Sequence, residues 1–200
     1  METAVIALKK AEEIPSLNCD YIGCDAGALV LARKGIRMKY AIGDFDSVEE
    51  NDLTEIQNFA DEVIRLNPVK DDSDSEAALR LAKEKGYQKA LLYGAFGGRP
   101  DHAYVNYMLA YLYPDFAVMH GKHGKAYAVS EGRYVFDRTH AYVSFFTKDG
   151  AVISLSGMKY PLDHRSISSS DIYTLSNEVT DEEGVLIVHE GVVLVIEADD

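Results

Sequence analysis

The chain has 200 residues, a length that suits one large domain or two modest ones. Hydrophobic residues make up 47% of it, which supports a packed core and excludes the composition of a disordered chain. The net charge of −13 argues against a nucleic-acid backbone or an anionic membrane surface as the main partner. A chain this acidic must recruit metal cations if it handles polyphosphates.

The opening residues and the cysteines favour a cytoplasmic location. Charged residues interrupt the first apolar run after a few positions, so we expect no signal peptide, and no apolar run is long enough to cross a membrane. Cys19 and Cys24 have the spacing of neither a zinc pair nor a redox pair, and buried inert thiols are the simpler interpretation. Reduced thiols are typical of a reducing compartment.

Short apolar runs alternate with helical stretches from the start of the chain to residue 122. The expected strands are residues 5–8, 21–24, 40–42, 63–66, 90–93 and 116–119. The expected helices are residues 28–34, 49–60, 75–85 and 102–113. Capping boxes at Ser47…Glu50 and Ser73…Glu76 mark two of the helix starts. This alternation predicts an α/β domain with a mainly parallel sheet over residues 1–122.

The pattern changes after residue 122 to short strand-like runs without a helical segment. The expected strands are residues 126–129, 142–147, 152–155, 185–188 and 192–196. Turn pairs at Asp149-Gly150 and Glu190-Gly191 separate several of them. We therefore expect a second domain over residues 123–200, folded as an all-β sandwich.

Acidic residues follow the predicted parallel strands of the first domain. Because the carboxyl ends of parallel strands meet at the edge where such sheets bind ligands, these carboxylates should share one rim. They include Asp25, Asp44, Asp46, Asp71, Asp74 and Asp101. Carboxylates that cluster repel one another unless a cation shares the site, and oxygen ligands without His or Cys favour Mg²⁺.

Glycines and basic residues at the same rim suit a phosphate chain. The pair Gly97-Gly98 lets the backbone approach a phosphate closely, and the helix start that follows offers unbonded N–H groups. Arg99 and Lys70 supply positive charge for anionic oxygens. The sequence has neither a P-loop nor a dinucleotide fingerprint. The carboxylates, glycines and basic residues of the rim together predict a metal–polyphosphate site.

Single residues of this rim also have structural interpretations. Asp74 favours the first turn of its helix through the helix dipole, whatever else it binds. Ser47 and Ser73 fit helix caps better than ligands, and His102 fits a hydrogen-bonded residue at a helix start. Their joint placement, rather than any one of them, supports a site.

Taken together, the motifs resemble the thiamine pyrophosphokinase family over nearly the whole chain. They are, in order, Asp25-Ala26-Gly27, Gly43-Asp44-Phe45-Asp46-Ser47, Lys70-Asp71-Asp72-Ser73-Asp74-Ser75-Glu76, Gly97-Gly98-Arg99-Pro100-Asp101-His102 with Asn106, Gly157-Met158-Lys159-Tyr160-Pro161-Leu162 and Ser176-Asn177-Glu178. The resemblance implies an N-terminal α/β domain, a C-terminal β-sandwich, and a homodimer with active sites between subunits. It implies conversion of ATP and thiamine to AMP and thiamine diphosphate.

The resemblance also implies roles for individual residues. The acids of the Mg²⁺ site are Asp25, Asp44, Asp46 and Asp74. The positions that handle nucleotide and phosphates are Lys70, Asp71, Arg99, Asp101 and His102. The positions that hold thiamine are Tyr160, Thr174, Ser176 and Asn177.

This chain departs from the family pattern in two places. Leu8-Lys9 stands where family members often have two glycines, which puts nucleotide contacts by that loop in doubt. The chain has no Trp, whereas some relatives stack thiamine on one, so Tyr160 would supply the aromatic face for the cationic thiazolium.

We hypothesise a single in-line displacement, in which the thiamine hydroxyl attacks the β-phosphorus and AMP leaves. Asp101 is the first candidate for the proton acceptor and Asp71 the second, while Mg²⁺, Arg99 and Lys70 neutralise the transferring group. Two alternatives stay open: a diphosphokinase that acts on another alcohol, such as a hydroxymethylpterin, and a non-catalytic sensor of nucleotide or thiamine diphosphate.

Overall fold

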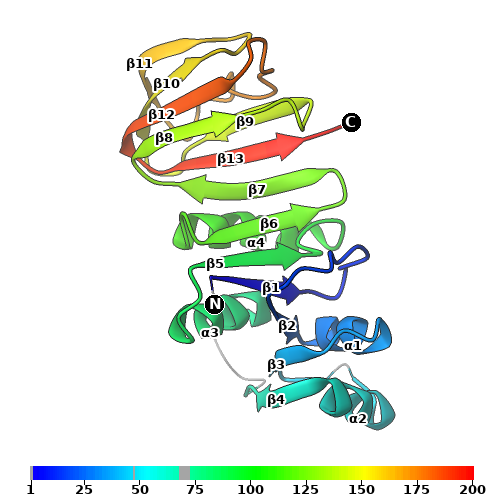
Figure 1. The fold of residues 1–200 in the computed structure, drawn as a ribbon. Coiled ribbons are helices and arrows are strands. Elements are labelled where there is room, and N and C mark those ends of the chain that lie inside the picture. Colours follow the sequence, from blue (N-terminus) through cyan, green and yellow to red (C-terminus); the bar gives the residue numbers. More distant parts are fainter. Residues whose placement is uncertain (1, 47, 68–72) are drawn as a thin grey trace. The chain divides into compact units, whose positions relative to one another are not determined.

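The computed structural model describes residues 2–46, 48–67 and 73–200, and the chain divides into two compact units (Figure 1). Unit 1 comprises Met1–Asn106 and Phe116–Lys122, and unit 2 comprises Tyr107–Asp115 and His123–Asp200. The segment Tyr107–Asp115, predicted as part of the first domain, is thus grouped with unit 2. None of the described helices is long and apolar enough to cross a membrane.

Unit 1 is built on a parallel sheet with the strand order β4-β3-β2-β1-β5-β6. The strands are β1 (Thr3–Ala7), β2 (Asp20–Cys24), β3 (Met38–Gly43), β4 (Ala60–Arg65), β5 (Lys89–Tyr93) and β6 (Ala117–Gly121). Each overlaps a strand predicted from the sequence, so the predicted parallel-sheet α/β fold is confirmed.

The strand order reverses direction between β1 and β5. The chain moves outward from β1 to β4 and then returns to β5 on the other side of β1. The connecting helices are α1 (Ala26–Arg33), α2 (Glu50–Phe59), α3 (Asp74–Glu84) and α4 (Pro100–Leu112). Right-handed crossovers that run in opposite directions place helices on both faces of a sheet.

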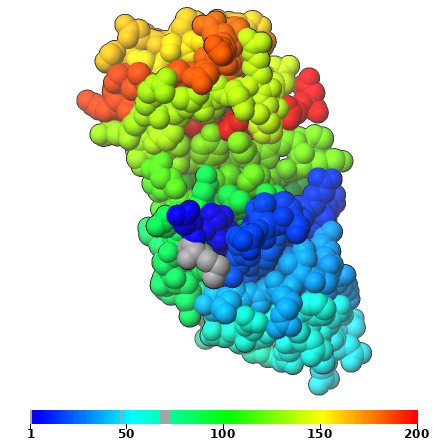
Figure 2. Space-filling view, in the orientation of Figure 1, coloured from blue at the N-terminus to red at the C-terminus, as the bar shows by residue number. Residues whose placement is uncertain are grey.

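Both faces of β1 are buried beneath these helices. Val5 and Ala7 pack with Leu31 of α1, whereas the alternating Ala4 and Ile6 are buried on the opposite face. The apolar run of β1 is continuous because neither of its faces meets water. Side chains fill the space between the ribbons in each unit, as the space-filling view shows (Figure 2).

One of the two predicted capping boxes lies at the start of α3. Ser73 is the N-cap residue, and its hydroxyl accepts a hydrogen bond from the Glu76 N–H at 3.2 Å. This bond fixes the helix start at Asp74, which places that carboxylate in the first turn.

The helix predicted over residues 49–60 is found as α2, but the predicted capping box at its start is wrong. This helix begins at Glu50 after the N-cap residue Glu49, whose side chain makes no capping bond. A turn comes first, in which the Val48 N–H donates to the Phe45 carbonyl at 3.0 Å, so the helix begins later than a cap at Ser47 would require. Ser47 itself lies outside the described residues.

Unit 2 contains antiparallel strands in the orders β7-β13-β9 and β11-β10-β12-β8. They are β7 (Gly124–Val129), β8 (Gly132–Phe136), β9 (Tyr142–Phe146), β10 (Ala151–Ser156), β11 (Leu162–Ile167), β12 (Gly184–Gly191) and β13 (Val193–Ala198). Phe145 and Val195 from the first set share one core with Phe136, Ile153 and Leu186 from the second. The predicted C-terminal all-β domain is confirmed.

Candidate functional site

A cavity of about 630 Å³ lies at the carboxyl edge of the unit 1 sheet. It is lined from the ends of β1, β2 and β5 and from the first turns of α3 and α4. Because strand order reverses between β1 and β5, this is the switch point at which open parallel sheets bind ligands. The polar residues that face it include Lys9, Lys10, Asp25, Asp74, Arg99, His102 and Asn106.

Two glycines allow the loops around the cavity to approach one another closely. A Cβ on Gly27 would lie 2.0 Å from the Ala7 carbonyl oxygen, because the first turn of α1 presses against the end of β1. Gly94 has a φ of 81°, and a Cβ there would lie 2.4 Å from the Ala11 nitrogen. A side chain at either position would push apart the loops that form the cavity.

Asp25 connects the cavity with the acidic loop that follows β3. Its N–H donates to the Ile42 carbonyl at 2.8 Å, and a Cβ on Gly43 would lie 2.9 Å from the Asp25 Cα. Asp25 also has a φ of 49°, a conformation that is rare outside glycine and concentrates at functional sites. The carboxylate that lines the cavity is therefore set beside the start of the second acidic motif.

In the loop after β3, the acids Asp44 and Asp46 flank the buried Phe45 in the sequence. Phe45 is 5% exposed and anchors the loop, while the Asp46 N–H donates to Asp44 Oδ1 at 3.1 Å. Asp44 is half-buried and Asp46 is exposed, and neither lines the cavity. Among the four predicted magnesium acids, the structure brings Asp25 and Asp74 to the cavity.

The donor set at the cavity suits Mg²⁺ bound together with phosphate. Within residues 2–46, 48–67 and 73–200, no group of three or more His, Cys, Asp and Glu side chains is placed to hold a metal ion. Mg²⁺ takes only one or two carboxylates and completes its shell with water and phosphate oxygens. Asp25 and Asp74, which line one cavity, therefore fit the ion without a closed cage of protein ligands.

Arg99 and Asp101 form an ion pair at the start of α4. Arg99 Nη2 lies 2.5 Å from Asp101 Oδ2, and Asp101 Oδ1 accepts the His102 N–H at 2.9 Å. The hydrogen bond from Arg99 lowers the pKa of Asp101, so this carboxylate stays ionised and is a weaker proton acceptor than an ordinary Asp. The two side chains are 74% and 59% exposed, so solvent screens the pair. Arg99 and His102 line the cavity, and Asp101 does not.

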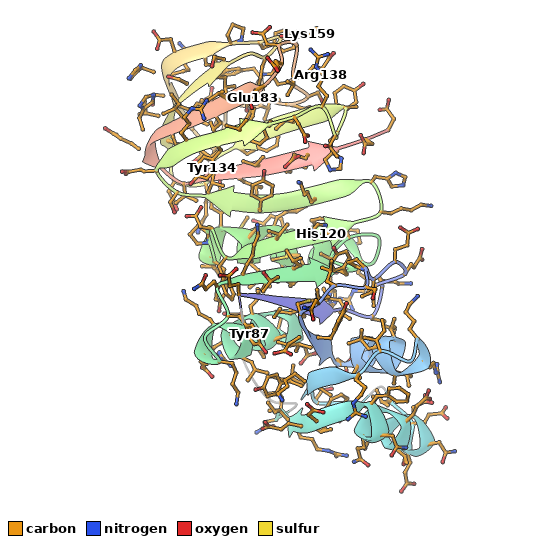
Figure 3. All side chains as sticks on the ribbon, viewed as in Figure 1. Tyr87, His120, Tyr134, Arg138, Lys159 and Glu183 are labelled. Atoms are coloured by element: carbon orange, nitrogen blue, oxygen red, sulfur yellow. The ribbon has the colours of Figure 1, made fainter. Side chains whose placement is uncertain are left out.

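Several polar residues of the lining had no predicted role, among them Asn106, Lys9 and Lys10. Asn106 is 5% exposed, and its Nδ2 donates to the Ala95 carbonyl at 2.6 Å, which ties α4 to the loop after β5. The Ala95 N–H in turn donates to the carbonyl of His120 at 3.1 Å, and His120, which lies on β6, is labelled in Figure 3. Lys9 and Lys10 are further additions, and their place directly after a predicted strand was the available signal. Lys70 and Asp71, predicted to contact phosphates, lie outside the described residues.

Three of the four residues predicted to hold thiamine, Tyr160, Thr174 and Asn177, line a small hollow in unit 2, and Ser176 does not. The hollow is lined by Leu155, Tyr160, Leu162, Tyr173, Thr174 and Asn177. Its volume of about 20 Å³ is enough for roughly one water molecule. This hollow alone therefore does not enclose an organic cation.

Asn177 holds the backbone of Tyr160 in place. Its Oδ1 accepts the Tyr160 N–H at 3.0 Å, and its Nδ2 donates to the Tyr160 carbonyl at 2.9 Å. Tyr160 is 55% exposed, and the Lys159 ammonium lies 5.7 Å from the centroid of its ring. Lys159 is also paired with Glu178 at 2.6 Å. By holding the Tyr160 backbone on both sides, Asn177 keeps the aromatic ring of Tyr160 in its exposed position.

The other two predicted thiamine residues make local contacts. Thr174 is 4% exposed, and its hydroxyl donates to the Phe145 carbonyl. Ser176 is exposed, has a φ of 54°, and its N–H donates to the Ser144 hydroxyl at 2.9 Å. The Ser176 hydroxyl therefore lies at the surface, while Thr174 links two backbone segments.

Comparison with known proteins gives one consistent result. The models of "Thiamin pyrophosphokinase, catalytic domain" and "Thiamin pyrophosphokinase, vitamin B1 binding domain" match residues 17–119 and 133–193. A thiamine pyrophosphokinase of Bacillus subtilis (strain 168) is 30% identical over 187 residues, which cover 90% of this chain and 87% of that protein.

Solved structures agree with these matches. A crystal structure of thiamine pyrophosphokinase from Bacillus subtilis superposes with a TM-score of 0.89 at 26% identity and covers 100% of both chains. The thiamin pyrophosphokinase structure from Geobacillus thermodenitrificans gives a TM-score of 0.82 at 28% identity, over 100% of this chain and 98% of that one.

Replacing Gly27 tests the packing that shapes the cavity. Gly→Ala inside a helix usually stabilises a protein by about 1 kcal/mol. Here Gly27→Ala should instead destabilise the chain by roughly 1–3 kcal/mol, because the new methyl group overlaps the Ala7 carbonyl. Thermal unfolding measures the difference. Gly98→Ala is the control, since a Cβ there meets only the Lys10 side chain at 3.9 Å. An unchanged or higher Tm for Gly27→Ala would contradict the packing.

Proposed function

The chain belongs to the thiamin pyrophosphokinase family, and from this premise we propose that it transfers the diphosphate of ATP to the hydroxyl of thiamine at the unit 1 cavity. The observation that carries the proposal is the composition of that cavity, where Asp25 and Asp74 line the same space as Arg99 and two lysines. Its volume of about 630 Å³ lies within the usual range for small-molecule sites.

Asp25 and Asp74 would hold Mg²⁺ against the polyphosphate, with Asp44 and Asp46 as further ligands from the adjacent loop. A bound Mg²⁺ would neutralise charge on the phosphate oxygens and orient them for displacement. The contribution of the chain is to fix the carboxylates: Asp25 through its bond to Ile42, and Asp74 through the cap of α3.

Arg99 would exchange partners when the nucleotide binds. In the structure its guanidinium bonds Asp101, and this bond lowers the pKa of that carboxyl. When Arg99 turns to the phosphates, the pKa of Asp101 rises towards its ordinary value, so Asp101 becomes the better proton acceptor as the thiamine hydroxyl attacks. The hydroxyl oxygen forms a bond to the β-phosphorus, the bond to the α-phosphate oxygen breaks, and AMP leaves. Asp71 remains the second candidate for this role.

Tyr160 would stack on the cationic thiazolium of thiamine. Its ring is exposed and its backbone is held on both sides by Asn177. Because Lys159 already lies over the ring, a second cation would take the opposite face. Thr174, Ser176 and Asn177 would complete the surface around it.

We further propose a homodimer in which the unit 2 hollow of one subunit faces the unit 1 cavity of its partner. The support is the volume of the hollow, about 20 Å³, which leaves thiamine without an enclosing wall on this surface. A cytoplasmic location is proposed from Cys19 and Cys24, which remain thiols, and from the need for ATP.

An assay of AMP release against a panel of alcohols tests the proposed function. With ATP and Mg²⁺, the protein should release AMP with thiamine and not with a hydroxymethylpterin. Asp25→Asn and Asp74→Asn should each lower kcat by about a hundredfold or more, because Asn keeps the shape and removes the charge. Glu84→Gln, at the far end of α3, is the charge-matched control.

Two results would overturn the proposal. AMP release with the pterin alone would assign another diphosphokinase. Binding of thiamine diphosphate without any turnover would assign a sensor.

Replacing Tyr160 tests the thiamine surface. Loss of an aromatic ring from a bound cation costs about 0.5–2 kcal/mol, so Tyr160→Ala should raise the KM for thiamine roughly two- to thirty-fold with little change for ATP. Tyr160→Phe keeps the ring face and should behave like the parent. A rise confined to the KM for ATP would place Tyr160 outside the thiamine site.

Mixing two impaired variants, assayed at a thiamine concentration well below the raised KM, extends this test to the dimer. One carries Asp46→Asn, and the other carries Tyr160→Ala with Ser176→Ala. If sites are shared, random exchange should restore about a quarter of all sites, because one site of each mixed dimer receives both intact halves. No recovery after exchange confirmed by mass would contradict the shared site and leave the chemistry in place.

A further inference from the structure

Among the basic residues that line the unit 1 cavity, some form an ion pair with a carboxylate of the described residues and others do not. The basic lining residues in the part of the chain that the structure describes are Lys9, Lys10, Arg99 and His102. Arg99 is bonded to Asp101. No ion pair joins Lys9 or Lys10 to a carboxylate among the described residues, and both side chains are exposed at the cavity.

The turn that carries the two lysines is fixed on both sides. The Leu8 N–H donates to the Tyr93 carbonyl at 3.0 Å, which extends the pairing of β1 with β5. The Ala11 N–H donates to the Leu8 carbonyl at 3.0 Å and closes the turn. Leu8 and Ala11 are 8% and 3% exposed, so they anchor the turn in the unit 1 core. Lys9 and Lys10 are therefore presented from a rigid backbone at the switch point.

The side chain of Lys10 runs towards the loop that precedes α4. Its Cγ lies 3.9 Å from the place that a Cβ on Gly98 would take. Gly98 is followed directly by Arg99, so the two basic side chains approach the cavity from adjoining loops.

Charge balance explains why a polyphosphate needs these lysines. Asp25 and Asp74 line the same cavity and repel an anion until a cation binds them. A lysine ammonium is a compact charge with three donors, and it binds phosphate oxygens well from a flexible stem. At the turn after β1, this chain offers the phosphates two long cationic side chains rather than a close approach of the backbone.

We propose that Lys10, supported by Lys9, binds the polyphosphate chain of ATP directly and sets the preference of this site for nucleoside triphosphate over monophosphate. The inference rests on the proposed function, because it names the groups that hold the substrate at that site. It assigns the turn after β1 a side-chain role in nucleotide binding.

Calorimetric titration of the full chain with ATP, ADP and AMP at fixed Mg²⁺ tests the proposal. Lys10→Gln should weaken ATP binding about tenfold or more, because it removes charge-assisted hydrogen bonds. ADP binding should weaken less and AMP binding least. Lys9→Gln should follow the same order with smaller losses. Lys10→Arg keeps the charge and should stay within a few-fold of the parent. Lys89→Gln, at the opposite end of β5, is the matched control and should bind ATP normally.

The phosphate series separates direct binding from a structural role. A variant that only disturbed the fold would weaken ATP, ADP and AMP by the same factor, and that result would overturn the proposal. Unchanged ATP affinity in Lys10→Gln and in the double variant with Lys9→Gln would also overturn it, while the proposed function stands. If the parent chain binds no ATP in the presence of Mg²⁺, the proposed function fails, and the role of the lysines fails with it.

Discussion

A chain with a net charge of −13 can hold a polyphosphate only where local cations outweigh the surrounding carboxylates. Unit 1 brings such cations together at the cavity between the ends of β1 and β5. Lys9, Lys10 and Arg99 supply positive charge there, while Asp25 and Asp74 would supply oxygen ligands for the metal proposed to bind with the phosphates. The acids and the bases thus belong to one electrostatic arrangement. The metal would balance the charge of the carboxylates, and the nucleotide phosphates would balance the charge of the basic side chains.

Backbone packing determines where these charges lie. Parallel strands end at a common edge, so the loops after β1, β2 and β5 begin close to one another. At Gly27 and Gly94 the backbones of these loops come so close that a Cβ would not fit. Asp25, directly after β2, adopts a positive φ. Unit 2 uses a different device, in which the amide of Asn177 holds the Tyr160 backbone from both sides. Tyr160 is exposed and the Asn177 side chain that holds its backbone is buried, whereas Asp25 in unit 1 is itself half-buried.

Fold class followed from the sequence because local patterns determine it: helical and strand periods alternate up to residue 122, and strand-like runs alone follow. The edge strand β11 escaped prediction because its residues are largely exposed and polar, which removes the apolar pattern. The edge strand β8 escaped because it is largely exposed and its apolar run is only three residues long, Tyr134-Val135-Phe136. The rim position of Asp25 and Asp74 was predictable from strand ends. The roles of Lys9 and Lys10, the pairing of Arg99 with Asp101, and the small volume of the unit 2 hollow depend on distances between loops, which no local pattern encodes.

If the unit 1 cavity binds ATP through a metal held by its carboxylates, the ATP affinity of the full chain should depend on Mg²⁺. Calorimetry over a range of Mg²⁺ concentrations measures this dependence most directly. Removing Mg²⁺ should weaken ATP binding at least about tenfold. Asp25→Asn with Asp74→Asn should lose most of this dependence, while Glu84→Gln should keep it. Equal ATP affinity with Mg²⁺ and with a chelator would show that no metal held by these carboxylates takes part in ATP binding.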